Sequence, residues 1–204
     1  MNSPNSGAIR VRDWLPIVYD VARRRFPRDI QLRDGSKARL HELRSRDREL
    51  MKAFFASCSP NAIRYRFLAS IRGPSDSLLD YLADADGLYH FALVVTQGLD
   101  DDEKIVAESR YVIAKDRPYT ADIALLVLDE MQGHGIATLL IHELTEIACS
   151  RGVTRFSADV LPDNGAILSL LRKTGHRLSA NVRQGVIHIE FPIACGEENV
   201  SKAA

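Results

Sequence analysis

Hydrophobic and polar residues recur along the chain with two periods, which predicts a mixed α/β protein. Apolar residues at helical spacing predict helices over residues 14–26, 47–56, 60–68, 75–83, 134–149 and 164–173. Apolar runs bounded by turn residues predict strands over residues 30–33, 38–43, 89–96, 104–114, 120–128, 154–161, 177–180 and 185–191. Because meandering strands precede one β-α-β unit, we expect an α/β fold of the α+β type, with a mixed sheet flanked by helices.

Composition adds several exclusions to this picture. The 204 residues carry 27 Lys and Arg against 27 Asp and Glu, and this balance argues against nucleic acid as the main partner. Ile123–Leu128 is among the longest apolar runs and is too short to cross a membrane. The first residues lack the pattern of a signal peptide. Three widely spaced cysteines show no metal-ligand pattern, so we expect a cytoplasmic, reduced protein without a metal.

The segment from Asp122 to Thr138 carries the clearest chemical signal. A nearly continuous apolar strand leads into a turn with Gly133 and Gly135, and a helix begins at once. Glycines let a ligand approach the backbone closely, and the first turn of a helix offers unpaired N–H groups and a positive dipole end. The arrangement predicts a site for phosphate or pyrophosphate, whose positive potential comes from backbone N–H groups rather than from lysine or arginine.

The spacing of this turn distinguishes between phosphate-binding folds. The segment lacks both the Lys-Ser/Thr ending of a P-loop and the GxGxxG pattern of dinucleotide-binding folds. Gln132, Gly135 and Ala137 instead form Gln-x-x-Gly-x-Ala, which resembles the signature of the GCN5-related N-acetyltransferase (GNAT) family. Downstream, Asp159–Asn164 and Leu170–His176 resemble that family's fifth strand, Asn-capped helix and glycine ending.

The resemblance implies a GNAT fold with a mostly antiparallel sheet of six to seven strands. It covers roughly residues 31–193. We expect an N-terminal extension over residues 1–30, partly disordered with a short helix, and a flexible tail over residues 194–204. The resemblance also implies that acetyl-coenzyme A is the acetyl donor and that its pyrophosphate lies on the turn. The cofactor-binding residues it implies are Leu126, Val127, Leu128, Gln132, Gly133, His134, Gly135, Ile136, Ala137, Thr138 and Asn164.

Upstream segments resemble one subgroup, the acetyltransferase domains of bacterial Pat-like protein-lysine acetyltransferases. They include Leu32–Gly35, Ser59–Pro60 and Arg64–Phe67. In that subgroup a Glu early in the fourth strand is the general base, and the matching position is Asp122. The alternation of the strand places Asp122 on the same face as Leu126, where apolar neighbours would raise the pKa of its carboxyl group.

Other residues compete for the catalytic roles. Glu108 is the alternative base. The tyrosine that in many relatives protonates the departing thiolate corresponds to Leu171, so Tyr119, Tyr111 or solvent would have to replace it. Cys149 is interpreted as a small buried apolar residue rather than a nucleophile.

These observations predict an N-acetyltransferase that uses direct attack by a primary amine. Backbone N–H groups at Val127 and Leu128 would polarise the thioester carbonyl. The subgroup favours a protein lysine as the acceptor. A small-molecule amine, or an acetyl-coenzyme A-binding sensor without turnover, remains an alternative. We expect a monomer or a homodimer, with no nucleic-acid, membrane or metal partner.

Overall fold

The computed structural model describes residues 26–173 and 177–195. The helix predicted over residues 14–26 falls outside these ranges apart from its last residue. The same holds for Gly175 and His176 of the predicted helix ending, and for all of the tail beyond Cys195.

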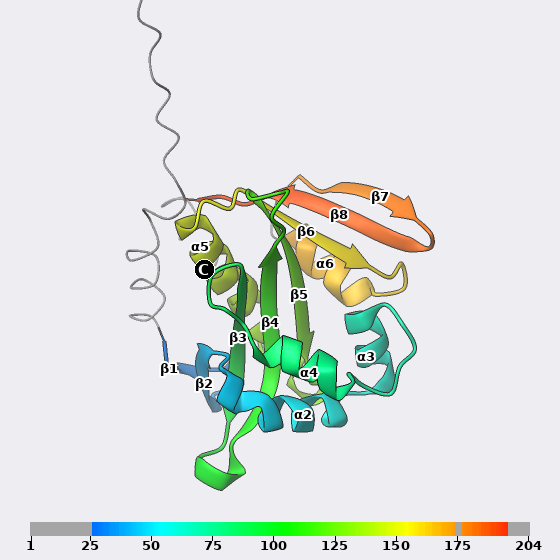
Figure 1. Cartoon of the computed structure of the whole chain (residues 1–204). Coiled ribbons are helices and arrows are strands. Elements are labelled where there is room, and N and C mark those ends of the chain that lie inside the picture. The colour runs from blue at the N-terminus through cyan, green and yellow to red at the C-terminus, as the bar shows by residue number, and fades with distance from the viewer. Residues whose placement is uncertain (1–25, 174–176, 196–204) are drawn as a thin grey trace, which may run out of the picture.

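An eight-stranded sheet forms the centre of the protein, in the order β1-β2-β3-β4-β5-β6-β8-β7 (Figure 1). The strands are β1 (Arg28–Gln31), β2 (Lys37–Glu42), β3 (His90–Gln97), β4 (Lys104–Ile113), β5 (Thr120–Val127), β6 (Arg155–Val160), β7 (Ser179–Arg183) and β8 (Val186–Pro192). Neighbouring strands are antiparallel except for β5 and β6, which are parallel. The expected six to seven strands become eight because β7 pairs with β8 as an outer hairpin.

Five α-helices lie in the described part of the chain: α2 (Arg48–Ser57), α3 (Pro60–Phe67), α4 (Asp76–Ala83), α5 (Ile136–Ser150) and α6 (Gly165–Lys173). Their bounds agree with the hydrophobic periodicity of the sequence. Ser59 caps α3 by accepting a hydrogen bond from the N–H of Ala62, as the Ser-Pro dipeptide predicts.

Helices cover both faces of the central strand β4. Arg110, on one face, donates to the carbonyl oxygen of Leu82 in α4. Tyr111, on the other face, receives a hydrogen bond from Arg151 at the end of α5. Figure 1 shows α2 and α4 in front of β3 and β4. Nearly every side chain of β3 and β4 is therefore buried, as expected of strands covered on both sides.

The turn between β1 and β2 lies beside the glycine turn that precedes α5. Gly35 adopts the left-handed conformation, with φ of 85°, as a tight hairpin requires. The N–H of Arg33 donates to the carbonyl oxygen of His134 at 3.4 Å, and His134 Nε2 lies 3.3 Å from a carboxylate oxygen of Asp34. The hairpin thereby supports the candidate phosphate-binding turn. No helix in the described ranges is long and apolar enough to span a bilayer.

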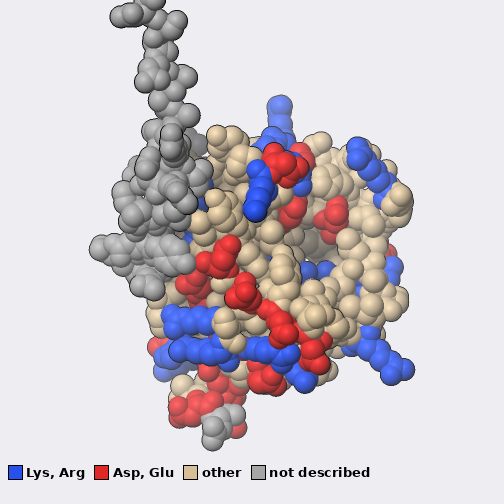
Figure 2. Space-filling view, in the orientation of Figure 1, with Lys and Arg blue, Asp and Glu red and all other residues tan. Residues whose placement is uncertain are grey.

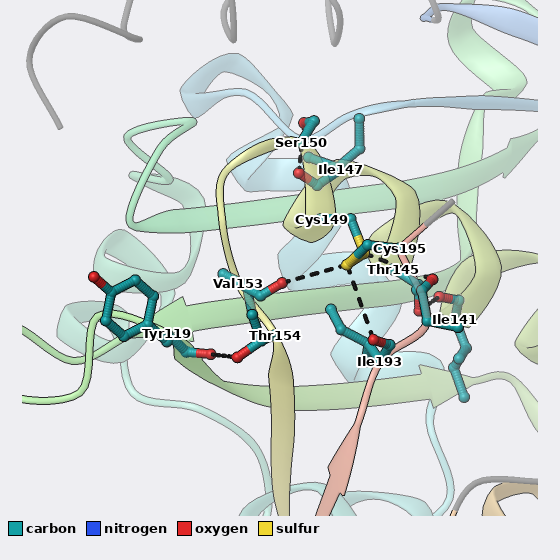
Figure 3. The surroundings of a disulfide bond; sticks show 11 residues. Tyr119, Ile141, Thr145, Ile147, Cys149, Ser150, Val153, Thr154, Ile193 and Cys195 are labelled. Atoms are coloured by element: carbon teal, nitrogen blue, oxygen red, sulfur yellow. Dashed lines mark hydrogen bonds between the residues drawn. A yellow bond between two sulfur atoms is a disulfide. The ribbon is translucent and has the colours of Figure 1, made fainter. Parts of the chain in front are cut away.

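The prediction of three reduced cysteines is wrong for two of them. Cys149 at the end of α5 and Cys195 beyond β8 form a disulfide (Figure 3). The N–H of Ile193 bonds to the carbonyl oxygen of Thr154, which brings the end of β8 beside the end of α5. A separation of 46 residues gave no sequence signal for this pair. Cys58 is free, and burial raises the pKa of its thiol to about 12.

Reduction should destabilise the protein measurably. A loop of 46 residues corresponds to about 4 kcal/mol in the chain-entropy treatment of cross-links, or a fall of roughly 10 °C in Tm for a chain of this length. We expect one titratable thiol in the denatured, oxidised protein and three after reduction. A Cys149→Ser/Cys195→Ser variant should show no change in Tm with reductant. Three thiols before reduction would contradict the disulfide.

Candidate functional site

A cavity of about 680 Å³ opens where β5 and β6 separate. The two strands pair over only three residues, ending at Asp122 and Ser157. Beyond that point β5 stays with β4 and β6 stays with β8. Residues of α3, α5 and α6 line the opening together with both strands. Its volume is in the range of small-molecule sites, and Figure 2 shows a hollow on one face in which basic atoms are visible.

The turn before α5 has the properties predicted for a phosphate site. Gly133 and Gly135 both have positive φ, 82° and 85°, a conformation that disfavours other residues. Within the described ranges, the backbone N–H groups from Gly133 to Thr138 donate to no protein acceptor. Gly133, Gly135 and the first residues of α5 line the cavity. These unpaired donors and the helix dipole fit a pyrophosphate group.

The cavity collects most of the residues predicted to bind the cofactor. Those that line it are Leu126, Val127, Gln132, Gly133, Gly135, Ile136, Ala137, Thr138 and Asn164. Two predicted residues, Leu128 and His134, are not part of its lining. The side chain of His134, which the sequence analysis counted among the cofactor-binding residues, instead contacts Asp34 in the β1–β2 hairpin.

At the end of β5, one of the two backbone N–H groups predicted to polarise the thioester carbonyl already has a partner in the protein. The N–H of Leu128 already donates to the carbonyl oxygen of Val106 at 3.0 Å. Hydrogen-bonded and non-hydrogen-bonded pairs alternate along an antiparallel ladder. Val127, which pairs with Ala107, therefore directs its N–H away from β4 and toward the opening. Of the two predicted donors, only the N–H of Val127 has no partner on β4.

Asn164 occupies the predicted place at the start of α6. Its side-chain oxygen accepts a hydrogen bond from the N–H of Ile167 at 3.3 Å, which is the usual contact of an N-cap residue. The same residue lines the cavity, so capping does not prevent contact with a ligand.

Asp122 lies at the last β5–β6 pair, one residue before the cavity lining begins at Ile123. Its side chain is 52% exposed and lies 3.5 Å from Arg117 Nη2, and it accepts a hydrogen bond from Ser157. Its pairing with Val112 puts it on the face of Leu126, as predicted. The side chain is thus half-exposed between two polar groups, rather than enclosed by the apolar surroundings expected there.

The other predicted catalytic candidates are not part of the cavity lining. Glu108 is fully buried and bonded to Arg110. Tyr111 is buried against Arg151, and burial raises the pKa of its hydroxyl group. Tyr119 is exposed in the turn before β5. None of the three lines the cavity.

Distant segments supply cavity residues that the sequence reasoning missed. Arg33, Tyr65, Arg66, Asp159 and Lys173 all line the cavity. The expectation that backbone N–H groups alone make the cleft positive is therefore wrong. The spacing of the hairpin gave no signal for Arg33, because only the tertiary contact with the glycine turn brings it there.

Two of the missed side chains are held by partners at the rim. The hydroxyl of Tyr65 donates to the carbonyl oxygen of Asp163 at 3.0 Å. Asp159 lies 2.8 Å from Nδ1 of His188, and this hydrogen bond raises the pKa of the imidazole. In the described ranges, no group of three or more His, Cys, Asp or Glu side chains could hold a metal ion.

Solved structures identify this arrangement as a GNAT fold. The crystal structure of the GNAT domain of S. lividans PAT superposes with a TM-score of 0.75 and 28% identity, covering 82% of this chain and 97% of that one. The fold predicted from the motifs is confirmed, with the eight strands described above.

Residues 49–176 match the model of the acetyltransferase (GNAT) family, which is more than half of the chain, so the chain belongs to that family. It is 36% identical over 111 residues to acetyltransferase Pat of Mycolicibacterium smegmatis, covering 54% of this chain and 33% of that protein. It is 31% identical over 121 residues to acetyltransferase PA5475 of Pseudomonas aeruginosa, covering 59% and 64%. The chain thus spans a third and just under two thirds of these relatives. The family places it among the N-acetyltransferases, as predicted.

Replacing Gly135 should separate backbone strain from ligand binding. An alanine Cβ at this position would lie 3.0 Å from Arg33 Nε in a backbone with φ of 85°. We expect Gly135→Ala to lower stability by about 1–2 kcal/mol and to weaken acetyl-coenzyme A binding by about tenfold. Gly152→Ala is the matched control, because φ is 78° there and nothing lies within 4 Å. Thermal denaturation and calorimetry measure both effects; equal affinities of the two variants would contradict the site.

Arg33 should contribute to affinity through its charge. It lines the cavity and has an exposed side chain, so we expect Arg33→Gln to weaken acetyl-coenzyme A binding roughly three- to tenfold. The loss should shrink at high salt because the contact is screened. Arg39→Gln on the same hairpin, whose Arg39 is held by Asp29 at 3.0 Å, is the control. An unchanged affinity for Arg33→Gln would remove the residue from the site.

Proposed function

We propose that the protein transfers the acetyl group of acetyl-coenzyme A to a primary amine. The observation that carries this proposal is the row of unpaired N–H groups from Gly133 to Thr138 beside the separation of β5 and β6. With its pyrophosphate bound to these N–H groups, the rest of acetyl-coenzyme A would extend between the two strands. The N–H of Val127 would then polarise the thioester carbonyl.

The proposed reaction is direct attack without an acyl-enzyme. The acceptor ammonium loses a proton to Asp122, through a bridging water where the carboxylate does not reach. The neutral amine then attacks the carbonyl carbon, a C–N bond forms, and the C–S bond breaks. Exposure of Asp122 beside the cavity supports this route, because the carboxylate can exchange its proton with solvent. Among the hydroxyl groups that line the cavity, the phenol of Tyr65 is the most acidic, and we propose it as the group that protonates the departing thiolate.

A protein lysine is the acceptor we favour. The relatives named acetyltransferase Pat and GNAT domain of S. lividans PAT support this choice, together with the Pat-like motifs upstream of the site. A small-molecule amine is the second candidate. A sensor that binds acetyl-coenzyme A without turnover is the third, favoured by Asp in place of Glu at position 122 and by the buried Leu171 where relatives carry a tyrosine.

A cytoplasmic location is part of the proposal because the reaction consumes acetyl-coenzyme A. In such a reducing compartment the Cys149–Cys195 disulfide would be exposed to cellular reductants. We also propose that the protein is a monomer or a homodimer.

Substituting Asp122 tests the catalytic base. Loss of a general base costs about 10²- to 10⁴-fold in rate, so we expect Asp122→Asn to lower kcat/KM by that factor. The dissociation constant of acetyl-coenzyme A should stay within about twofold, since Asp122 does not line the cavity. Asp122→Glu should retain activity. Thiol release with a panel of amines and acetylatable proteins, and calorimetry with acetyl-coenzyme A, provide the measurements.

Asp116→Asn, in the exposed turn before β5, is the matched control for this experiment. Full activity in Asp122→Asn would refute the assignment, and loss in Asp159→Asn instead would move the base to that carboxylate. Binding of acetyl-coenzyme A without turnover on any acceptor would support the sensor. Absence of binding would refute the proposed function.

A further inference from the structure

A group of charged side chains lies under the inner wall of the cavity, between α3 and β4. Glu108 is fully buried and accepts a hydrogen bond from Nε of Arg110. Its second carboxylate oxygen lies 3.6 Å from Nε of Arg66. His90 lies beside them, with Nε2 2.7 Å from Nη1 of Arg110. Three elements, α3, β3 and β4, thus bring these groups together.

The charges of this cluster do not cancel. Arg66 and Arg110 are two cations, whereas Glu108 is the one carboxylate within ion-pair distance of either among the described residues. Burial, followed by the charge of Arg110, lowers the pKa of His90 to about 4, so this imidazole is neutral at physiological pH. One positive charge therefore remains uncompensated. Burying a charge without a partner is costly, which indicates that an anion joins the cluster when the site is filled.

Arg66 is the member of the cluster that can receive this anion. It alone of the four residues lines the cavity, and its side chain is only 10% exposed. Its Nε and Nη2 atoms are buried without a hydrogen-bond acceptor in the described part of the chain. Burial also lowers the pKa of this guanidinium, as expected for a cation that lacks full compensation.

The position of Arg66 connects it to the reaction site. Glu108, to which it is nearest, pairs with Leu126 across the β4–β5 ladder. Leu126 lines the cavity and precedes Val127, whose N–H faces the opening. Arg66 therefore lies near the part of β5 where the thioester carbonyl would bind, because its partner Glu108 pairs with the residue that precedes Val127. The candidate phosphate-binding turn at the start of α5 is a separate part of the cavity lining.

We propose that Arg66 is the anchor of a carboxylate subsite beside the reacting atoms, filled either by a carboxylate of the acceptor, such as an acidic side chain next to a target lysine, or by a dicarboxylic acyl group accepted in place of acetyl. A planar guanidinium suits a carboxylate, and Arg66 Nη2 has neither a hydrogen-bond acceptor nor an ion-pair partner among the described residues. This inference rests on the proposed function for the identity of the reaction, but carboxylate binding itself does not require turnover. Arg66 acts here as a binding residue and exchanges no proton.

Simple carboxylates test the subsite without knowledge of the natural substrate. With the protein saturated by coenzyme A, the Nε–H signal of Arg66 is followed by NMR during titration with acetate or with acetamide, its neutral isostere. The signal is identified by its absence in Arg66→Gln. We expect a saturable shift with acetate and none with acetamide. Equal responses to the two probes, or no saturable shift, would overturn the proposal.

Two further comparisons distinguish the source of the carboxylate. Calorimetry compares succinyl-coenzyme A with acetyl-coenzyme A, and L-lysine with L-lysinamide in the presence of coenzyme A. We expect one pair to favour the carboxylate by about ten- to hundredfold. The preference should fall within twofold in Arg66→Gln and be partly kept in Arg66→Lys. A preference that survives in Arg66→Gln would overturn the assignment.

Arg72→Gln provides the matched control, because Arg72 is exposed and lies outside the cavity lining. The melting temperature and the affinity for acetyl-coenzyme A report whether each variant is folded. If Arg66→Gln does not fold, the Arg66→Lys variant and the wild-type titration still decide. Acetate binding without turnover would refute acetyl transfer and keep the subsite. Turnover without any carboxylate preference would support acetyl transfer and refute the carboxylate subsite.

Discussion

The separation of β5 from β6 after three paired residues is the constraint on which the rest of the site depends. A sheet that stops pairing in its middle leaves backbone groups without strand partners, and buried groups of this kind are costly. The separation is maintained because each strand is held from its other side, β5 by β4 and β6 by β8. The N–H of Val127 and the cavity between the strands both result from it. The same fold that pays this cost places the glycine turn and the start of α5 at one end of the opening.

The local features of this site could be predicted from the sequence, because local rules determine them. Gly133 and Gly135 are needed wherever a strand turns directly into a helix with positive φ. Asn164 follows the usual preference for an N-cap, and the face of Asp122 follows from strand alternation. The helices and strands in the described ranges follow from hydrophobic period and turn residues, although β1 and β7 are displaced by two to three residues from the predicted ranges. In each case the residues that decide the outcome are close together in the sequence.

The features that could not be predicted depend on contacts between distant segments. Arg33 reaches the cavity because a hairpin 100 residues before the glycine turn bonds to His134. The N–H of Leu128 is unavailable because β5 pairs with β4 on that side. The hydrophobic pattern of β5 does not show which strand lies beside it. Cys149 and Cys195 meet because β8 ends beside α5. The polar setting of Asp122 depends on Ser157, which the pairing of β5 with β6 brings to it across 35 residues of sequence.

The glycine turn and the inner wall of the cavity at Arg66 obtain their positive potential in different ways, and the two ways suit different kinds of ligand. At the glycine turn the potential comes largely from backbone N–H groups, which any chain with the same turn provides, with Arg33 added from the hairpin. At the inner wall it comes from Arg66, whose charge is not fully compensated because it shares the single carboxylate of Glu108 with Arg110. A binding site built from backbone geometry suits a ligand common to a whole family. A buried charged side chain held at a cost suits recognition of one class of reactant, because removing the matching group from the ligand leaves the guanidinium unpaired. The neutral total charge of the chain is consistent with both sources of potential, since it results from local excesses that cancel over the whole surface.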